Sequence, residues 1–354
     1  MSAPVPPSAP APSSRGPVDP AAAPTVATEA PLLTVAGLGI RFPLGGWPKR
    51  RTLRAAHAVS FTIRPGEIVA LVGESGSGKS TIGRAIARIQ PMATGAVTLH
   101  GAEPLTVGPA APAAPMVWRR RVQLIFQDPF ASLNPVYSVG HPVARALLLH
   151  GRATPADVDQ KVVAALESVG LEPAAEMAAR YPHQLSGGQR QRVSIARALA
   201  TEPDLVIADE PTSMLDVSIR MDILRLFTRI RDGGRRSVLL ITHDLASARL
   251  VADRAVVLYA GQVMEAGPAA QVLGAPRHPY AQLLAAAASR GGGLHTPLPA
   301  TGGTPPIVDP KPGCPFAARC PHVVARCRAE DPPVVPLGPD HVVRCFLPPS
   351  LASS

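Results

Sequence analysis

The sequence has few aromatic and few charged residues. Aromatic side chains make up 4% of the 354 residues and charged side chains 17%, against 46% hydrophobic residues. This composition is typical of a packed α/β protein rich in small aliphatic residues, and it excludes a largely disordered chain. Because basic clusters such as Arg119–Arg121 have few rings beside them on which bases could stack, we expect no nucleic-acid partner despite a formal charge of +10.

Long apolar runs are also missing. No stretch approaches the roughly 18 consecutive apolar residues that a membrane-spanning helix needs. The N-terminus lacks the charged segment followed by an apolar segment that is typical of a secretory signal. The sequence therefore predicts that, if the protein works at a membrane, it does so as a peripheral subunit.

Cysteine is rare, and its four copies all lie near the C-terminus. Cys314, Cys320, Cys327 and Cys345 are separated by five, six and seventeen residues, unlike the two-residue spacing of common zinc ribbons. Four thiolates in one place suit a tetrahedral zinc ion or a [4Fe–4S] cluster. Reduced structural thiols are the other interpretation, since disulfides are disfavoured in a cytosolic subunit.

Changes in composition divide the chain into three predicted parts. Residues 1–30 are nearly all Ala, Pro, Ser, Thr and Val and predict a disordered tail. Residues 31–275 alternate strand-like and helix-like segments, the order expected of an α/β domain with a parallel sheet and helices on both faces. We expect an antiparallel β element at its start, an Ala- and Pro-rich loop at 104–115, and a helical insertion at about 136–188. Residues 276–354, rich in proline and cysteine, predict a small C-terminal module.

A glycine-rich segment follows the predicted strand Ile68–Val72 and opens a predicted helix, Lys79–Ile89. Its sequence, Gly73-Glu74-Ser75-Gly76-Ser77-Gly78-Lys79-Ser80, matches the phosphate-loop pattern, in which backbone N–H groups and a helix N-terminus cradle phosphate oxygens. The pattern predicts that Lys79 holds the β- and γ-phosphates and that Ser80 binds Mg²⁺. We expect the whole segment, with the adjacent Thr81, to bind the nucleotide.

A second apolar run, Leu205–Ala208, ends in two carboxylates, Asp209 and Glu210. Four apolar residues predict a buried strand that delivers both acids to its carboxyl end. Asp209 then suits the magnesium shell, and Glu210 suits activation of the attacking water. Such a pair alone is often only a strand end, and it becomes a functional candidate because a phosphate loop precedes it.

The order of six elements along the chain resembles the ATP-binding-cassette (ABC) ATPases. They are the phosphate loop, Gln127, the signature Leu185-Ser186-Gly187-Gly188-Gln189, the pair Asp209-Glu210, the segment Ser213-Met214-Leu215-Asp216, and His243. The resemblance covers roughly residues 32–345 and implies an ATPase with Lys79, Gln127, Glu210 and His243 as its catalytic set.

Further roles follow from this resemblance. It implies that Gln127 senses the γ-phosphate and Mg²⁺, and that His243 aligns Glu210 with water. Phe42, about thirty residues before the phosphate loop, corresponds to the aromatic that stacks on adenine. Asp216 belongs to the same implied nucleotide site. The bulky Met214 is a departure, since the most similar members usually have alanine there.

The resemblance also implies a head-to-tail dimer, in which Ser186, Gly187, Gly188 and Gln189 act on the partner's ATP. The implied partners are a second ABC ATPase subunit in a heterodimer, two transmembrane permease subunits and an extracytoplasmic solute-binding protein. The implied location is the cytoplasmic face of the cell membrane.

Longer segments are similar to the oligopeptide and dipeptide importer ATPases, and more to the second of their two ATPase subunits. These segments are Gln127–Pro135, Tyr181–Gln189, Asp209–Ser213 with Leu215–Ile219, and Arg277-His-Pro-Tyr280 with the helix-like segment after it. This branch implies peptide import, and some members carry a [4Fe–4S] cluster at matching cysteines. Import of nickel or another small solute, and a non-transport switch protein that uses ATP and redox state, are the alternatives.

Overall fold

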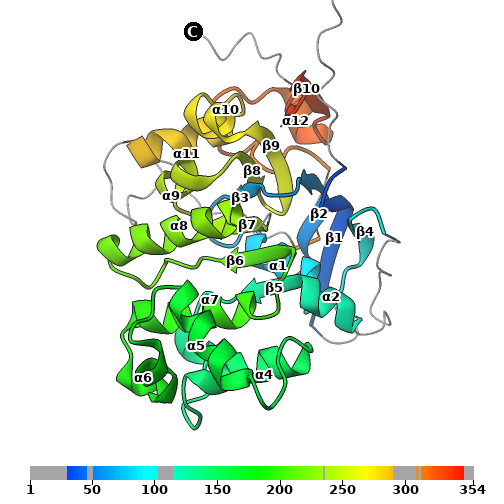
Figure 1. The fold of residues 1–354 in the computed structure, drawn as a ribbon. Helices are drawn as coiled ribbons and strands as arrows, with labels where there is room; N and C mark the ends of the chain where they lie inside the picture. Colours follow the sequence, from blue (N-terminus) through cyan, green and yellow to red (C-terminus); the bar gives the residue numbers. More distant parts are fainter. Residues whose placement is uncertain are drawn as a thin grey trace, which may run out of the picture.

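The computed structural model describes residues 30–45, 51–102, 115–233, 236–289, 308–309 and 312–346. Two β-sheets and the helices around them make up this part of the chain (Figure 1). Nearly all of the predicted N-terminal tail, and all but one residue of the predicted loop at 104–115, lie outside the described residues.

The main sheet has eight strands in the order β10-β11-β9-β8-β3-β7-β6-β5. Its parallel part, the predicted core, consists of β3 (Ile68–Val72), β5 (Val122–Ile125), β6 (Leu205–Asp209), β7 (Ser237–Thr242) and β8 (Arg254–Tyr259). Three antiparallel strands extend it on one side: β9 (Gln262–Pro268), β10 (Val334–Gly338) and β11 (His341–Arg344).

The parallel strands are buried on both faces, which explains why they read as unbroken apolar runs. On one face, Leu71 and Ile241 pack in a core with α1 (Lys79–Ile86) and the smaller sheet. On the other face, Ala70 and Leu240 pack toward five helices. These are α7 (Gly187–Leu199), α8 (Val217–Asp232), α9 (Leu245–Val251), α10 (Ala269–Gly274) and α11 (Pro279–Ser289).

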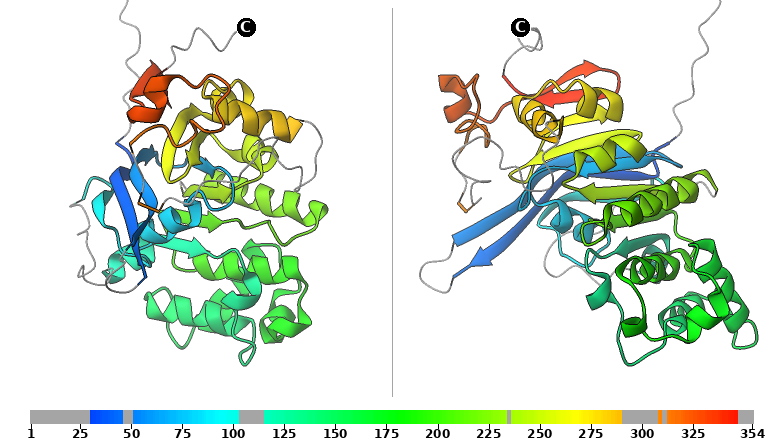
Figure 2. Two further views of the ribbon diagram at one scale, coloured as in Figure 1. Left: turned by 180° about the vertical axis from the view of Figure 1, so that it is seen from behind. Right: turned by 90° about the vertical axis from the view of Figure 1, so that its left-hand side faces the viewer.

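The predicted antiparallel element is a three-stranded sheet in the order β2-β1-β4. It comprises β1 (Leu33–Leu44), β2 (Arg51–Ile63) and β4 (Thr94–Leu99). β2 begins six residues before the predicted strand at His57, since residues 51–56 pair with the far end of β1. In the right-hand view of Figure 2 this β1–β2 ribbon projects away from the body of the molecule.

Helices fill the predicted insertion. They are α4 (Gly140–Leu149), α5 (Val158–Ser168) and α6 (Ala174–Ala179), followed by a 3₁₀ turn at Pro182–Gln184. A short helix, α3 (Pro129–Ser132), precedes the predicted start of the insertion. Val162, Leu166 and Val169 are buried in the core shared with α7, as their helical spacing predicts. Two short helices, α2 (Met116–Arg121) and α12 (Ala325–Ala329), complete the set.

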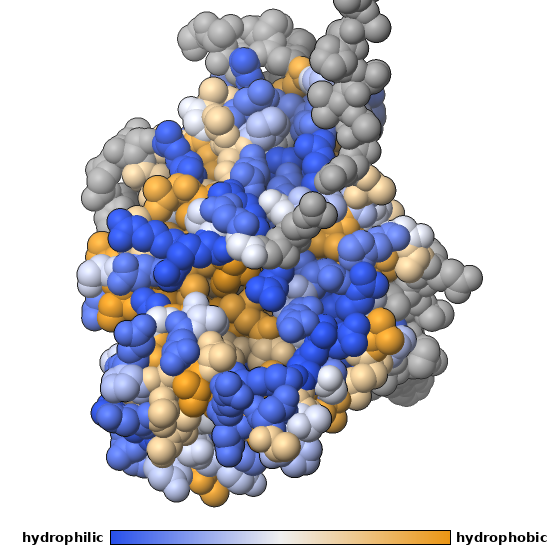
Figure 3. Space-filling model, in the orientation of Figure 1, coloured by the Kyte–Doolittle hydropathy of each residue, from blue (hydrophilic) through white to orange (hydrophobic). Residues whose placement is uncertain are grey.

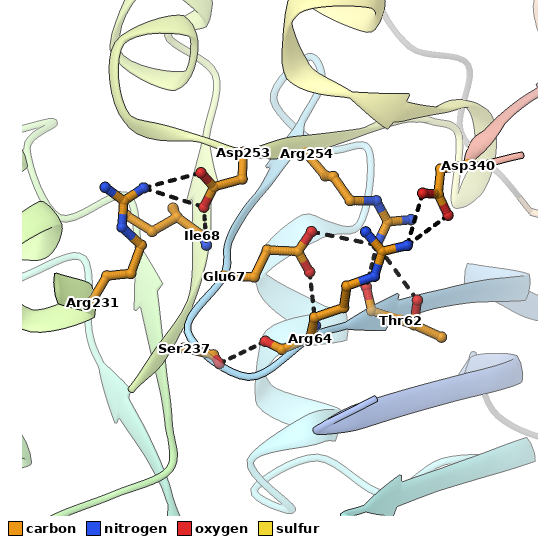
Figure 4. A network of polar contacts seen from close by, with 9 residues as sticks. All are labelled: Thr62, Arg64, Glu67, Ile68, Arg231, Ser237, Asp253, Arg254 and Asp340. Carbon is orange, nitrogen blue, oxygen red and sulfur yellow. Dashed lines mark hydrogen bonds and ion pairs between the residues drawn. The ribbon is translucent and has the colours of Figure 1, made fainter. Parts of the chain in front are cut away.

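The C-terminal segment adds two strands, β10 and β11, to the main sheet. β11 pairs with β9 through Val342 opposite Ala266 and Val343 opposite Glu265. Figure 4 shows a network of polar contacts at the edge of the main sheet where its parallel strands β3, β7 and β8 begin. There Arg64, before β3, donates from Nη2 to both carboxylate oxygens of Asp340 in the β10–β11 turn, at 2.7 and 2.8 Å.

In the described part of the chain, no helix is long and apolar enough to cross a membrane. Hydrophilic side chains cover most of the face seen in Figure 3, with smaller apolar patches among them.

Candidate functional site

The phosphate loop connects β3 to α1 in a tight backbone path. Gly73, Gly76 and Gly78 have φ angles of +155°, +78° and +99°, values that residues with a side chain rarely adopt. The loop also packs against backbone, since the Gly261 N–H donates to the Ser77 carbonyl at 2.9 Å. The glycines thus let the loop curve while lying close to neighbouring strands.

Lys79 is the first residue of α1, and its side chain is buried under the loop. Its Nζ donates to the carbonyls of Gly73 and Glu74, both at 2.8 Å. Burial lowers the pKa of Lys79, whereas the carboxylates of Glu210 and Asp209 act in the opposite direction. The ammonium group is therefore held at the mouth of the loop, where it can meet phosphate oxygens.

Ser80 and Asp209 bring two oxygen donors together beside the loop. The Ser80 hydroxyl donates to Asp209 Oδ1 at 2.7 Å, although 129 residues separate them. Asp209 is only 1% exposed, and burial raises the pKa of its carboxyl group. Its nearest cation is Arg84, 4.0 Å away. A buried carboxylate beside a hydroxyl suits Mg²⁺, a hard cation that prefers oxygen ligands, so these two residues fit the ion that a nucleotide brings.

Glu210 lies between Gln127 and His243. Gln127 Nε2 donates to Glu210 Oε2 at 3.0 Å, and His243 Nδ1 lies 3.1 Å from Glu210 Oε1. The three side chains follow β5, β6 and β7, which are neighbours in the sheet. Ligands of open α/β sheets bind at such carboxyl ends.

The backbone and charge of Glu210 are both constrained. Its φ of +45° is unusual for a residue with a side chain, and its N–H donates to the Ile241 carbonyl at 2.8 Å. The hydrogen bond with His243 lowers the pKa of Glu210 against the effect of burial, and it raises the pKa of His243. The carboxylate is thus held ionised and oriented.

The signature residues form the start of α7. Ser186 precedes the helix; its hydroxyl accepts from the Gln189 N–H at 3.3 Å, and Gln189 Oε1 accepts from the Ser186 N–H at 3.0 Å. This reciprocal pair is a capping box, which fixes the first turn of a helix. Ser186 is exposed, so the positive end of the helix faces solvent.

Two other predicted nucleotide contacts lie at the ends of elements. Phe42, half-buried near the end of β1, lies opposite Leu53 of β2 and packs against the edge of the core. Asp216 is exposed at the position just before α8. Met214, the departure from the expected alanine, is 54% exposed beside it.

The four cysteines line one small cavity together with His278 and Phe316. Burial raises the pKa of Cys314 to about 11 and also raises the pKa of Cys320, so these two thiols hold their protons at neutral pH. Among the described residues, no three Cys, His, Asp or Glu side chains are placed to hold a metal ion. The described part of the structure therefore gives no support to the predicted [4Fe–4S] cluster or to zinc.

The sequence did not reveal what holds Glu74, which we expected only to bind nucleotide. Its carboxylate forms a bidentate ion pair with Arg319, with both N–O distances at 2.8 Å. Its N–H donates to the Tyr280 hydroxyl at 2.9 Å. Both contacts span more than 200 residues, and no local pattern signals such a pairing.

Comparison with known protein families finds two matches. The family described as "ABC transporter" matches residues 56–213, and "Oligopeptide/dipeptide transporter, C-terminal region" matches residues 264–327. A putative peptide import ATP-binding protein of Brucella abortus is 42% identical over 86% of this chain and 91% of its own. A probable peptide ABC transporter ATP-binding protein of Sinorhizobium fredii is 39% identical over 89% of this chain and 90% of its own.

Two solved structures share the fold. One is the ATP-binding cassette MJ0796, described as a dimeric post-hydrolysis state bound to ADP and Pi; its TM-score is 0.58 at 27% identity, over 67% of this chain and 98% of that one. The other is cbiO1 of Clostridium perfringens, part of the ABC transporter complex cbiONQ, with a TM-score of 0.59 at 27% identity, over 70% and 92%.

Proposed function

This chain belongs to the ATP-binding proteins of ABC transporters, which hydrolyse ATP, and we propose that it powers the import of oligopeptides or dipeptides. The observation that carries ATP hydrolysis as the source of power is the geometry of the ATP site. One edge of the sheet brings together the phosphate loop, the Ser80–Asp209 pair and the Gln127–Glu210–His243 group. Peptide as the cargo is supported by the C-terminal family match and by the names of the relatives.

In the proposed mechanism, Lys79 neutralises negative charge on the β- and γ-phosphates while the backbone N–H groups of the loop hold their oxygens. Ser80 and Asp209 would hold the Mg²⁺, which would neutralise charge that develops on the phosphates. Glu210 accepts a proton from the attacking water, because its carboxylate is ionised and faces the same edge. Gln127 and His243 keep that carboxylate in line with the γ-phosphate.

Phe42 is proposed to contact the adenine ring. It lies on the projecting β1–β2 ribbon and is only half-buried, and aromatic rings of this kind can stack on a base. This contact adds binding free energy without taking part in the chemistry.

A second ATPase subunit completes the site in this proposal. Ser186–Gln189 present a capped helix start, a natural anion site, and Ser186 is exposed. The dimeric state described for MJ0796 is consistent with such a pairing. The exposed Met214 and Asp216 would then lie near the interface, and the implied heterodimer would pair this chain with a related subunit.

The proposed complex also contains two permease subunits and an extracytoplasmic solute-binding protein, with this chain at the cytoplasmic face of the membrane. We expect the tagged full-length chain to copurify with the permease subunits. In proteoliposomes, the binding protein loaded with peptide should stimulate ATP hydrolysis by the complex, and the Glu210→Gln complex is the control. Stimulation by nickel rather than peptide would reassign the cargo, and a chain that copurifies with no membrane subunit would contradict the transport function.

The Glu210–His243 pair predicts how turnover depends on pH. Its hydrogen bond lowers the pKa of Glu210, so the base stays ionised as pH falls through its ordinary range. In His243→Ala the bond is lost and burial dominates, so the pKa of Glu210 rises. The acidic limb of the kcat–pH profile should then move upward by ~1 pH unit. Because the pKa of Glu210 lies below its ordinary value, kcat is measured from about pH 3.5 to 7 so that both limbs are seen. His100→Ala, at an exposed histidine after β4, should leave the limb unmoved.

A further inference from the structure

The C-terminal segment contacts the phosphate loop directly, and the contact is made through Glu74. The turn between Cys314 and Cys320 carries Arg319, whose guanidinium forms the bidentate ion pair with the Glu74 carboxylate. Arg319 is 6% exposed and Glu74 is 14% exposed. A bidentate pair excluded from water is directional and strong compared with a surface ion pair.

Arg319 is itself held in place by aromatic residues. Its guanidinium lies 5.7 Å from the ring centroids of both Tyr259 and Phe316. Those rings pack edge-to-face at 5.4 Å, and Tyr280 packs 4.5 Å from Tyr259. Closely packed rings leave a guanidinium few alternative positions, so Arg319 is preorganised to meet Glu74.

A second connection reaches the same residue through Tyr280. Glu265, fully buried on β9, accepts from the backbone N–H groups of Arg277 and His278 at 3.0 and 2.7 Å. The His278 Nδ1 in turn accepts from the Tyr280 N–H at 3.0 Å. These bonds fix the start of α11 so that the Tyr280 hydroxyl accepts from the Glu74 N–H.

The third polar group of Glu74 leads to the catalytic lysine. Its carbonyl accepts from Lys79 Nζ at 2.8 Å. The side chain, the N–H and the carbonyl of one residue thus connect Arg319, Tyr280 and Lys79. Since Glu74 is part of the phosphate loop, its displacement by a fraction of an ångström would also shift Lys79 and the backbone N–H groups that must fit the phosphates.

We propose that Arg319 and Tyr280 are positioning residues, which set the phosphate loop for ATP through Glu74. The inference rests on the ATPase activity of the family and not on the identity of the cargo. It gives the C-terminal segment a part in nucleotide binding, although that segment lies outside the residues expected to touch ATP.

The test is a double-mutant cycle in the reconstituted transporter complex, with ATPase rates measured against ATP concentration. We expect Arg319→Gln and Glu74→Gln each to raise the KM for ATP about tenfold with kcat nearly unchanged. Because both substitutions break the same link, the double variant should also show about a tenfold rise, whereas independent effects would multiply to about a hundredfold.

Arg64→Gln is the matched control. It removes another arginine–carboxylate ion pair between the C-terminal segment and the body, Arg64–Asp340, at the opposite edge of the sheet. It should lower the Tm of the chain at most slightly and leave the KM for ATP unchanged. An equal change in KM for Arg64→Gln and Arg319→Gln would mean general loosening of the segment and would overturn the proposal.

Tyr280→Phe keeps the test decisive if Arg319→Gln fails to fold. It deletes only the hydroxyl that accepts from Glu74 and keeps the packed ring, and it should raise the KM for ATP about fivefold. Wild-type KM values in Tyr280→Phe and in any folded Arg319 variant would refute the inference. Since the wild-type complex is assayed alongside, that result would leave the proposed ATPase function intact.

Discussion

Glu210→Gln should leave ATP binding intact and lower the rate of ATP hydrolysis by about a thousandfold, within the range for loss of a general base. The amide retains the shape of the side chain and can still interact with Gln127 and His243. It cannot accept a proton from water at neutral pH. Lys79, Ser80 and Asp209, which hold the phosphates and Mg²⁺ in the proposed mechanism, are untouched.

Two measurements on the reconstituted complex check this expectation. Equilibrium binding of ATP should give a Kd within about threefold of the wild-type value, and single-turnover hydrolysis should show the slow step to be chemistry. Steady hydrolysis at the wild-type rate would refute the role of Glu210 as base. A large loss of ATP affinity would instead assign the residue to binding.

Gly78→Ala should raise the KM for ATP more than a hundredfold, because the loop cannot keep its path. A Cβ atom at Gly78 would lie 2.2 Å from the Ala55 carbonyl oxygen. That oxygen belongs to the backbone of β2 and cannot rotate away as a side chain would. The φ of +99° adds strain for any residue but glycine.

Gly76→Ala is the matched control within the same loop. Its φ of +78° is also left-handed, yet a Cβ atom there would meet open space among the described residues. The expected cost is therefore only the conformational strain, ~1 kcal/mol, or several-fold in KM. Steady-state kinetics of the two variants, with Tm values to confirm folding, separates the effect of the Cβ clash with β2 from the strain of a positive φ angle. Equal KM values would show that contact with β2 is unimportant.

The parts of the site that are built from neighbouring residues in the chain could be predicted without the structure. The phosphate loop and the Asp209-Glu210 pair each depend on a few consecutive residues after a strongly apolar strand, and β3 has the predicted boundaries. The parallel strands could be recognised in the sequence because they are buried on both faces. Their sequences are therefore continuously apolar and lack the polar alternation of strands with one exposed face.

The parts that depend on distant pairing could not be predicted in this way. β9 has a buried glutamate in its middle, Glu265, whose partners lie outside the strand: the N–H groups of Arg277 and His278 and the ring of His341, 76 residues away. The proline in β10 also argues against a strand in sequence-based reasoning. The contact between Glu74 and Arg319 has no local signature at all, because an ion pair across 245 residues depends on how the sheet assembles.

The β10–β11 hairpin also determines what the sheet presents at its margin. Without it, β9 would expose a row of unpaired backbone groups, a template on which another chain could add and start aggregation. β10 is a poor replacement template, since Pro336 lacks an N–H and the strand is only five residues long. The hairpin therefore covers an edge that would otherwise favour aggregation. Loss of the last described residues, from about 334 onward, would make β9 an exposed edge strand.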